Sequence, residues 1–264
     1  MTAETRVPNP APSAPLLSLV IPAYNEAARI VPTLEEAVAS LEALDIAWQV
    51  LVVDDGSSDR TRVLAEAFAR RYPAIQIESL PHRGKASAVS HGFRVAAGDL
   101  ILFSDADLAT PLRYIEPFIK RSRDGFDVVI ASREGLNANR IGEPAYRHVM
   151  GRVFNWFVQL LLLPGIEDSQ CGFKLFTRQA AHAVVDRSCL YRDLDTQVSG
   201  SRVTAFDVEL LVIARRLGYR VESIPVEWTY GTNSKVNPIR DSLLNARDLL
   251  LIKWNDLRGR YNHP

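Results

Sequence analysis

Two aspartates separated by one residue, Asp105 and Asp107, stand where an apolar stretch of the chain ends. Two carboxylates at this spacing in a tight loop can face one hard divalent cation, because such cations prefer oxygen ligands. A metal held there can also bind the diphosphate of a substrate. Taken alone, such a pair is more often a solvated turn former, but its position directly after an apolar strand favours the metal site, so both interpretations stay open.

A second acidic pair, Asp54 and Asp55, follows another apolar run. An ionised carboxylate accepts hydrogen bonds, so this pair can receive the imide N–H of uracil or a ribose hydroxyl. The alternative is that the pair only turns the chain and caps the next helix. Gly84 and Lys85 open a further predicted helix, where backbone N–H groups and the lysine can meet a phosphate, or where the glycine is a plain cap.

The apolar runs before these residues are short and rich in Leu, Val and Ile, which is typical of buried strands. Segments with apolar residues three and four positions apart lie between them and predict helices. Alternation of strand and helix favours the α/β class, with a single, mostly parallel central sheet flanked by helices and ligands at the carboxyl ends of its strands. Strands are predicted at about 16–23, 48–53, 75–80, 99–104, 127–132, 173–176 and 219–228, and helices at about 30–41, 59–72, 84–97, 146–162, 203–217 and 238–257.

Composition excludes several classes of protein. The 264 residues are 47% hydrophobic and 23% charged, which excludes collagen-like, coiled-coil and wholly disordered chains. Because 31 Lys and Arg balance 31 Asp and Glu, no net charge attracts nucleic acid. The chain lacks both G-x-G-x-x-G and the Walker phosphate loop. Cys171 and Cys189 have neither disulfide-framework nor zinc spacing, which favours a reducing compartment.

The ends of the chain and its most apolar helices bear on domains and membranes. Residues 1–15 carry four prolines and no signal-peptide core, so they are predicted to be a disordered lead, and the protein is predicted not to be secreted. One domain is predicted over 16–264. The apolar stretch 153–163 is too short to span a bilayer; it can lie on a membrane or fill a core. The helix predicted at 238–257 mixes leucines with basic residues, and is either an interfacial helix or an ordinary packed one.

Seven segments together resemble a known family. LVIPAYNEAARI, VVDDGSSDRT, GKASAVSHGF and DLILFSDADLATP, in this order and at these spacings, are similar to the N-terminal half of the family 2 (GT-A fold) inverting glycosyltransferases. SQCGFKLFTR, FDVELLVIARRLGYRVESIPVEW and SKV narrow the resemblance to the dolichyl-phosphate β-glucosyltransferase and polyprenyl-phosphate sugar transferase group. The resemblance covers about 16–255. It implies transfer of glucose from UDP-glucose, with inversion, to a polyprenyl or dolichyl phosphate, by a cytoplasmic protein peripheral to the cytoplasmic face of a membrane.

The resemblance also implies a donor site in the first part of the domain, about 16–110. Asp105 and Asp107 correspond to the D-x-D motif that carries Mg²⁺ or Mn²⁺, with Asp107 also counted as catalytic. Related mannosyl enzymes have a Gln where this chain has Ala109, which leaves the third metal ligand to Thr110 or water. The residues implied to hold the nucleotide sugar are Pro22, Ala23, Tyr24, Glu26, Asp54, Asp55, Lys85, Asp105 and Ala106.

The acceptor is assigned to the second part, about 111–264. An arginine binds phosphate oxygens in pairs through its planar fork, although helix arginines are otherwise most often solvated. If the acceptor were a sugar hydroxyl, a general base would be needed, and Asp168 and Asp207 are the candidates. A phosphate acceptor is already anionic and needs little base catalysis. The residues implied to hold the acceptor or its phosphate are Arg133, Arg147, Arg152, Gln170 and Lys235.

Three other functions compete with this interpretation. The first keeps the donor site but uses a soluble or cell-envelope saccharide as acceptor, and it predicts that Asp168 or Asp207 is essential while Arg133 and Arg147 matter little. The second, a sugar-phosphate nucleotidyltransferase, would need a Gly-rich basic loop where this chain has PAYNEA. The third is a non-catalytic binder of nucleotide sugars, which only Ala109 favours.

Overall fold

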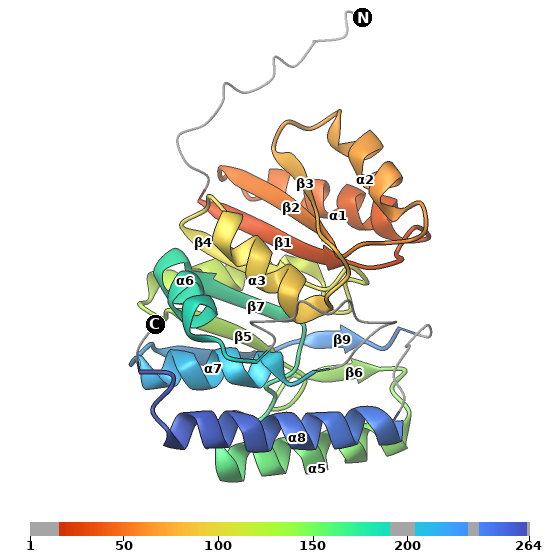
Figure 1. Cartoon of the computed structure of the whole chain (residues 1–264). Coiled ribbons are helices and arrows are strands. Elements are labelled where there is room, and N and C mark those ends of the chain that lie inside the picture. The colour runs from red at the N-terminus through yellow and green to blue at the C-terminus, as the bar shows by residue number, and fades with distance from the viewer. Residues whose placement is uncertain (1–15, 191–203, 232–237, 263–264) are drawn as a thin grey trace, which may run out of the picture.

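The computed structural model describes residues 16–190, 204–231 and 238–262, and within them a seven-stranded sheet runs through the molecule in the order β3-β2-β1-β4-β7-β5-β8 (Figure 1). A two-stranded sheet lies beside it. The central strands are β1 (Leu17–Ala23), β2 (Trp48–Asp54), β3 (Ile75–Ser79), β4 (Leu100–Ser104), β5 (Val128–Ser132), β7 (Phe173–Thr177) and β8 (Val221–Pro225), and the small sheet pairs β6 (Asn139–Ile141) with β9 (Glu227–Thr229).

Helices cover both faces of the central sheet, because successive strand side chains point to opposite faces and both sets are apolar. One core lies under α1 (Ile30–Glu42), α2 (Thr61–Ala69), the short 3₁₀ helix η1 (Leu112–Tyr114) and α4 (Ile115–Arg123). The other core lies under α3 (Lys85–Val95), α6 (Arg178–Arg187) and α7 (Phe206–Arg216). Two long helices, α5 (Ala145–Leu161) and α8 (Pro238–Leu257), lie side by side at the end of the molecule remote from β3 (Figure 1).

The direction of the strands decides which loops meet. β1 is parallel to β2 and β4, so the residues after these strands emerge at the same edge. β7 is antiparallel to both of its neighbours, β4 and β5, and pairs Phe173 with Ser104. The residues that precede β7 therefore reach the edge that the residues after β4 occupy. The prediction of a mostly parallel sheet flanked by helices is confirmed, with β7 as the reversed strand.

The elements differ from the sequence prediction in a few places. The strand predicted at 219–228 is divided into β8 and β9, and the helix predicted from 203 begins at Phe206. α4 and α6 were not predicted. α4 contains Pro117, which a helix tolerates in its first turn, where the proline's missing N–H is not needed. The predicted lead, 1–15, lies outside the described residues, and among the helices that are described none has the length and apolarity that crossing a bilayer requires.

Candidate functional site

The loops that follow β1 and β2 are tied together at the edge of the sheet. Asn25, whose φ is +54°, accepts the backbone N–H of Ser58 on its side-chain oxygen at 2.8 Å, and its own N–H donates to Ser57 Oγ at 2.9 Å. Asp55 N donates to the carbonyl of Ala23 at 2.9 Å. These bonds join the ends of β1 and β2 and the loops that follow them, where six predicted donor-site residues lie: Pro22, Ala23, Tyr24, Glu26, Asp54 and Asp55.

The two acidic residues of this edge have different surroundings. Asp55 is buried and accepts hydrogen bonds from His82 Nδ1, Arg83 N and Gly84 N, each at 2.8 Å, so its carboxylate builds the loop that leads into α3. The His82 ring stacks on Tyr24 with centroids 3.8 Å apart. Asp54 is also buried, but its Oδ1 has no hydrogen-bond partner among the described residues. Since a buried acceptor is rarely left unsatisfied, Asp54 is the better placed of the two to receive a ligand's N–H or hydroxyl.

Asp105 and Asp107 lie in a turn directly after β4, and their oxygen donors suit Mg²⁺ or Mn²⁺. Asp107 is exposed, and its Oδ1 accepts the N–H of Ala109 at 3.1 Å. The Thr110 hydroxyl is buried against Cys171 Sγ, 3.5 Å away, so it is not turned toward the carboxylates as a third ligand would be. The described residues contain no cluster of three or more His, Cys, Asp or Glu able to hold a metal, so a metal bound at this turn would have two carboxylates as protein donors and would take its further ligands from substrate and water.

A glycine from the second half of the chain makes room for the first carboxylate. A Cβ added at Gly172 would lie 2.0 Å from Asp105 Oδ2 and 2.5 Å from its Cγ, distances that real Cβ atoms do not show. The Asp105 N–H also donates to the Gly172 carbonyl at 3.1 Å. Sequence reasoning did not assign a role to Gly172; its place one residue before an apolar strand was the available signal. Gly231 stands farther off, with its Cβ position 3.6 Å from Asp107 Oδ2.

Two lysine–aspartate ion pairs lie at this position, and one of them includes Asp105. Lys85 Nζ lies 2.5 Å from Asp105 Oδ1, and Lys174 Nζ lies 2.6 Å from Asp207 Oδ1. Burial by itself lowers the pKa of Lys85, but Asp105 and Asp207 outweigh burial and the pKa is raised, so the lysine stays cationic. Burial raises the pKa of Asp207, against the opposing effect of Lys174. The Asp207 carboxylate is almost fully buried and bound to a lysine, which is the arrangement of a structural counter-ion.

On the acceptor side, Arg133 and Asp168 form a two-pronged ion pair. Arg133 Nε and Nη2 donate to the two carboxylate oxygens of Asp168 at 2.7 and 2.9 Å, and the Arg133 backbone N–H donates at 2.9 Å. Burial alone would raise the pKa of Asp168, but the guanidinium and these donors hold it at about 2. Asp168 is therefore poorly suited to be the general base considered from sequence; its carboxylate holds Arg133 in place.

Two aromatic residues connect the arginines predicted to bind phosphate. The Arg133 guanidinium lies 5.2 Å from the Trp228 ring centroid, and the Arg147 guanidinium lies 5.1 Å from that of Tyr230, to whose hydroxyl Arg147 donates at 2.6 Å. The two rings are 6.0 Å apart. Sequence reasoning missed both aromatic residues. Of the other predicted residues, Arg152 lies 3.3 Å from Glu134, the Gln170 N–H donates to Asp168 at 3.2 Å, and Lys235 lies outside the described residues.

The Asp168→Asn substitution tests this ion pair through stability. We expect the free energy of unfolding near pH 6 to fall by about 3–5 kcal/mol, because the substitution leaves the largely buried Arg133 charge without its partner. Since the pKa of Asp168 is about 2 in the folded chain and about 3.9 in an unfolded one, the native pair contributes stability above pH 4 that is lost as the pH falls toward 2.

The difference between wild type and Asp168→Asn should therefore narrow by about 2 kcal/mol between pH 6 and pH 2.5. Urea unfolding at a series of pH values measures it. A difference that stays constant over this range would contradict the assignment of the low pKa to Asp168.

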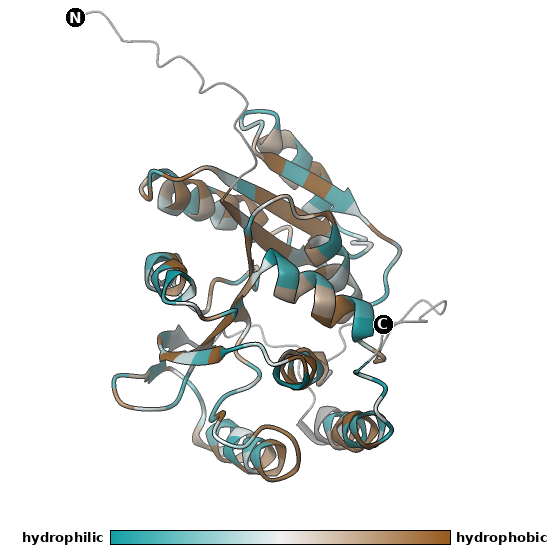
Figure 2. Cartoon of the chain, turned by 90° about the vertical axis from the view of Figure 1, so that its left-hand side faces the viewer, coloured by the Kyte–Doolittle hydropathy of each residue, from teal (hydrophilic) through white to brown (hydrophobic). Residues whose placement is uncertain are grey.

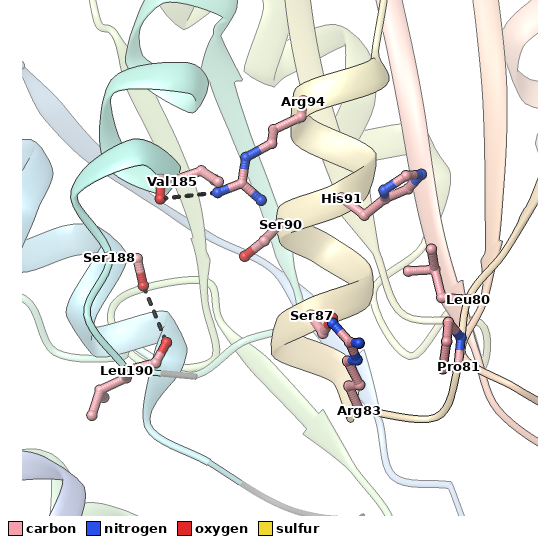
Figure 3. A pocket seen from close by; sticks show the side chains of 10 residues that line it. All are labelled: Leu80, Pro81, Arg83, Ser87, Ser90, His91, Arg94, Val185, Ser188 and Leu190. Atoms are coloured by element: carbon pink, nitrogen blue, oxygen red, sulfur yellow. Dashed lines mark hydrogen bonds between the residues drawn. The ribbon is translucent and has the colours of Figure 1, made fainter. Parts of the chain in front are cut away.

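A polar cavity of about 220 Å³ lies beside this edge, between α3 and the end of α6 (Figure 3). Arg94 donates across it to the carbonyl of Val185 at 3.5 Å, and Ser188 Oγ donates to the carbonyl of Leu190 at 3.4 Å. None of the residues predicted for the donor, metal or acceptor sites lines this cavity. The catalytic candidates lie instead at the open carboxyl edge of the strands, as the rule for α/β sheets expects.

Comparisons with known proteins agree with this geometry. A sequence profile described as Glycosyl transferase family 2 matches residues 18–185. The dolichyl-phosphate beta-glucosyltransferase of Dictyostelium discoideum is 32% identical over 92% of this chain and 75% of its own length, and that of Homo sapiens is 33% identical over 93% and 77%.

Solved structures share the fold. Glucosyl-3-phosphoglycerate synthase from Mycobacterium tuberculosis, crystallised with Mn²⁺, UDP and its product, matches 95% of this chain and 81% of its own, with a TM-score of 0.60 and 17% identity. Mannosyltransferase PcManGT from Pyrobaculum calidifontis, with GDP-Man and Mn²⁺, matches 93% and 65%, with a TM-score of 0.57 and 19% identity. The sheet with its reversed strand is thus the GT-A fold, and the chain belongs to glycosyl transferase family 2.

Proposed function

We propose that this glycosyltransferase moves glucose from UDP-glucose, with inversion, to a dolichyl or polyprenyl phosphate, using Mg²⁺ or Mn²⁺ at Asp105 and Asp107. The names of the curated relatives, which match more than nine tenths of the chain, support the sugar and the lipid phosphate. The two neighbouring structures contain Mn²⁺ with a nucleotide or nucleotide sugar, which supports the class of donor and metal. We place the reaction at the cytoplasmic face of a membrane; the spacing of Cys171 and Cys189 in the sequence, which is not that of a disulfide framework, supports a reducing compartment.

The donor is held by residues of the first two loops and of α3. The unpartnered Asp54 Oδ1 would accept an N–H or hydroxyl of the nucleoside, beside the Tyr24 ring. Lys85, already cationic at Asp105, would lie against the diphosphate. Asp105 and Asp107 would hold the divalent metal, whose charge would offset the negative charge that grows on the departing nucleoside diphosphate.

The pairing of the candidate bases is the observation that carries the choice of a phosphate acceptor. A sugar hydroxyl needs a base to take its proton, whereas a phosphate is an anion at neutral pH. Asp168 is bound to Arg133 and Asp207 to Lys174, so both carboxylates serve as partners of cations. Arg147, which lies over the Tyr230 ring, would supply the positive charge that an anionic acceptor needs, and Asp168 fixes the Arg133 guanidinium over the neighbouring Trp228 ring. Catalysis then consists of positioning and charge neutralisation.

The test is sugar transfer to a short polyprenyl phosphate in detergent, with radiolabelled UDP-glucose or GDP-mannose and either Mg²⁺ or Mn²⁺. We expect label in the organic phase from UDP-glucose. Arg147→Ala should lower the rate about 10- to 100-fold, because a charge-assisted bond to phosphate is lost, and Arg147→Lys should restore part of it. Arg71→Ala is the matched control, since Arg71 also stacks on an aromatic ring, Phe68 at 4.2 Å, but follows α2, which packs beside β3 at the end of the molecule remote from α5.

Other outcomes would support the competing functions. Transfer to a saccharide that survives Arg147→Ala and is abolished by Asp207→Asn would replace the lipid phosphate with a hydroxyl acceptor. Metal-dependent UDP binding without turnover on any acceptor would make the chain a binder of nucleotide sugars. Organic-phase label from GDP-mannose alone would overturn the donor assignment and leave the acceptor in place.

A further inference from the structure

The outward side of α5 carries a stripe of large apolar side chains. They recur every three or four positions, which places them on one side of the helix. They are between 37% and 65% exposed, and two of them, Trp156 and Phe157, pack edge to face with ring centroids 5.0 Å apart. The stripe consists of Tyr146, Val149, Met150, Val153, Trp156, Phe157 and Leu160.

A second stripe lies on α8, the helix beside α5. Leu243, Leu250, Trp254 and Leu257 are between 51% and 70% exposed. The two helices are adjacent, and Lys253 Nζ on α8 donates to the carbonyl of Leu161 at the end of α5, at 2.9 Å. Figure 2 shows hydrophobic residues on the helices at this end of the molecule. We call the two stripes together the α5–α8 surface.

Exposed apolar side chains are concentrated on this surface. Among the described residues, the large hydrophobic side chains exposed elsewhere are only Val63, Val95, Leu136 and Ile141, which are scattered over other elements. Single exposed hydrophobic residues are normal, but exposed apolar side chains gathered on two adjacent helices mark an interaction surface.

The charges of the two helices distinguish among partners. α5 contains no carboxylate in its sequence, and on the described side chains of α8, from 243 onward, both carboxylates are withdrawn: Asp248 is buried, and Asp256 pairs with Arg216 at 2.5 Å. Cations border the apolar stripes. Arg247 is exposed, Arg152 is exposed while lying 3.3 Å from Glu134, and the Arg258 guanidinium lies 4.1 Å from the Trp254 ring centroid. This combination of tryptophan and tyrosine, apolar side chains and basic borders, with no exposed acid among the described side chains of the two helices, suits anionic lipid headgroups above an acyl layer.

We propose that the α5–α8 surface docks on a lipid bilayer that contains anionic headgroups, with both helices lying in the interface. The inference rests on the proposed function in one respect, the reason why docking would be useful. Arg147, which we assign to the acceptor phosphate, is also on α5, so docking brings the acceptor side of the site to the lipid. Binding to a bilayer needs neither donor, metal nor acceptor, and so it can be measured separately from transfer.

Flotation of the full chain with lipid vesicles tests the proposal, without nucleotide, metal or polyprenyl phosphate. The vesicles are phosphatidylcholine alone, or phosphatidylcholine with 30% phosphatidylglycerol. We expect the chain to float with the anionic vesicles and more weakly with the neutral ones, and high salt to reduce the difference. Tryptophan fluorescence should shift to shorter wavelength on binding, because Trp156 and Trp254 are exposed in the free chain.

The double variant, with Trp156→Glu and Leu250→Glu in one chain, places one carboxylate in each stripe and should weaken vesicle binding at least tenfold. Both side chains are more than half exposed, so the fold should not be affected. The matched control is Val63→Glu on α2, at a valine that is 59% exposed and lies outside the surface; it should bind vesicles as wild type does. The double variant should keep wild-type transfer to a short acceptor in detergent.

Three results would overturn the proposal. The first is that the wild-type chain does not float with either kind of vesicle. The second is that the double variant floats as well as the wild type does. The third is that the wild type binds no vesicles and is a dimer in sedimentation while the double variant is a monomer, which would assign the surface to a second copy of the chain. Vesicle binding without any transfer would overturn the proposed function alone. Transfer in detergent without vesicle binding would overturn the docking surface alone.

Discussion

Asp107→Ala is expected to lower the rate of sugar transfer by about a thousandfold or more, because stabilisation of developing charge by a metal or dipole accounts for several kcal/mol of a barrier. Asp107 is exposed and accepts a hydrogen bond from the N–H of Ala109, a residue of its own turn, so the fold should survive the substitution. The same variant should lose the part of UDP affinity that depends on Mn²⁺, which titration calorimetry with and without the metal measures.

Asp99→Ala is the control for this experiment. Asp99 precedes β4 at the opposite end of the strand, its side chain is 68% exposed, and it pairs with Arg178 on the surface. Both activity and metal-dependent UDP binding should stay near wild type. If Asp107→Ala bound UDP with undiminished dependence on Mn²⁺, the assignment of this carboxylate as a metal ligand would be wrong.

Gly172→Ala is expected to lower kcat/KM by about a hundredfold while changing the thermal unfolding temperature little. The added methyl would overlap Asp105 Oδ2, and the carboxylate, at the end of a side chain, can turn away at small cost to the fold. It would then leave Lys85 and the position in which a metal needs it. A displacement of about 1 Å in a positioned catalytic group costs about a hundredfold in rate.

Gly151→Ala is the matched control, since a Cβ at this glycine of α5 meets nothing within 4 Å. Alanine should stabilise the helix by up to about 1 kcal/mol and leave activity unchanged. Transfer rates, UDP affinity and thermal unfolding of the two variants separate an effect on Asp105 from an effect on the fold. Loss of stability in Gly172→Ala that matches its loss of activity would contradict the expectation.

Much of the fold and the first half of the site could be predicted from sequence, because local pattern determined them. Buried runs of branched residues followed by polar loops placed Asp54, Asp55, Asp105 and Asp107 at the ends of strands, and parallel strands bring such ends to one edge. The sequence could not predict which of Asp54 and Asp55 accepts hydrogen bonds from the next loop and which is left to receive a ligand. This difference depends on His82, Arg83 and Gly84, which reach Asp55 from a loop after the next strand.

The acceptor side was harder to predict, because its contacts join residues far apart in the chain. The pairing of Arg133 with Asp168 leaves no trace in the sequence near either residue, so Asp168 was taken for a candidate base. The run FKLFT of β7 has the same apolar pattern whichever way the strand runs, and its reversal is what brings Gly172 to Asp105. The stripe on α5 was noticed as an apolar stretch, but its exposure depends on what packs against the helix.

The reversed strand β7 also has a consequence for how the chain folds during synthesis. β1, β2, β3 and β4 can pair as soon as residue 104 has emerged, but β4 then has one open edge, made of the apolar run Leu100–Ser104, until β7 arrives. Unpaired apolar edge strands are templates for aggregation, and pairings that join distant parts of a chain form slowly. Nascent or truncated chains that end before residue 173 should therefore aggregate more than chains that include β7, in which the edge of β4 is paired.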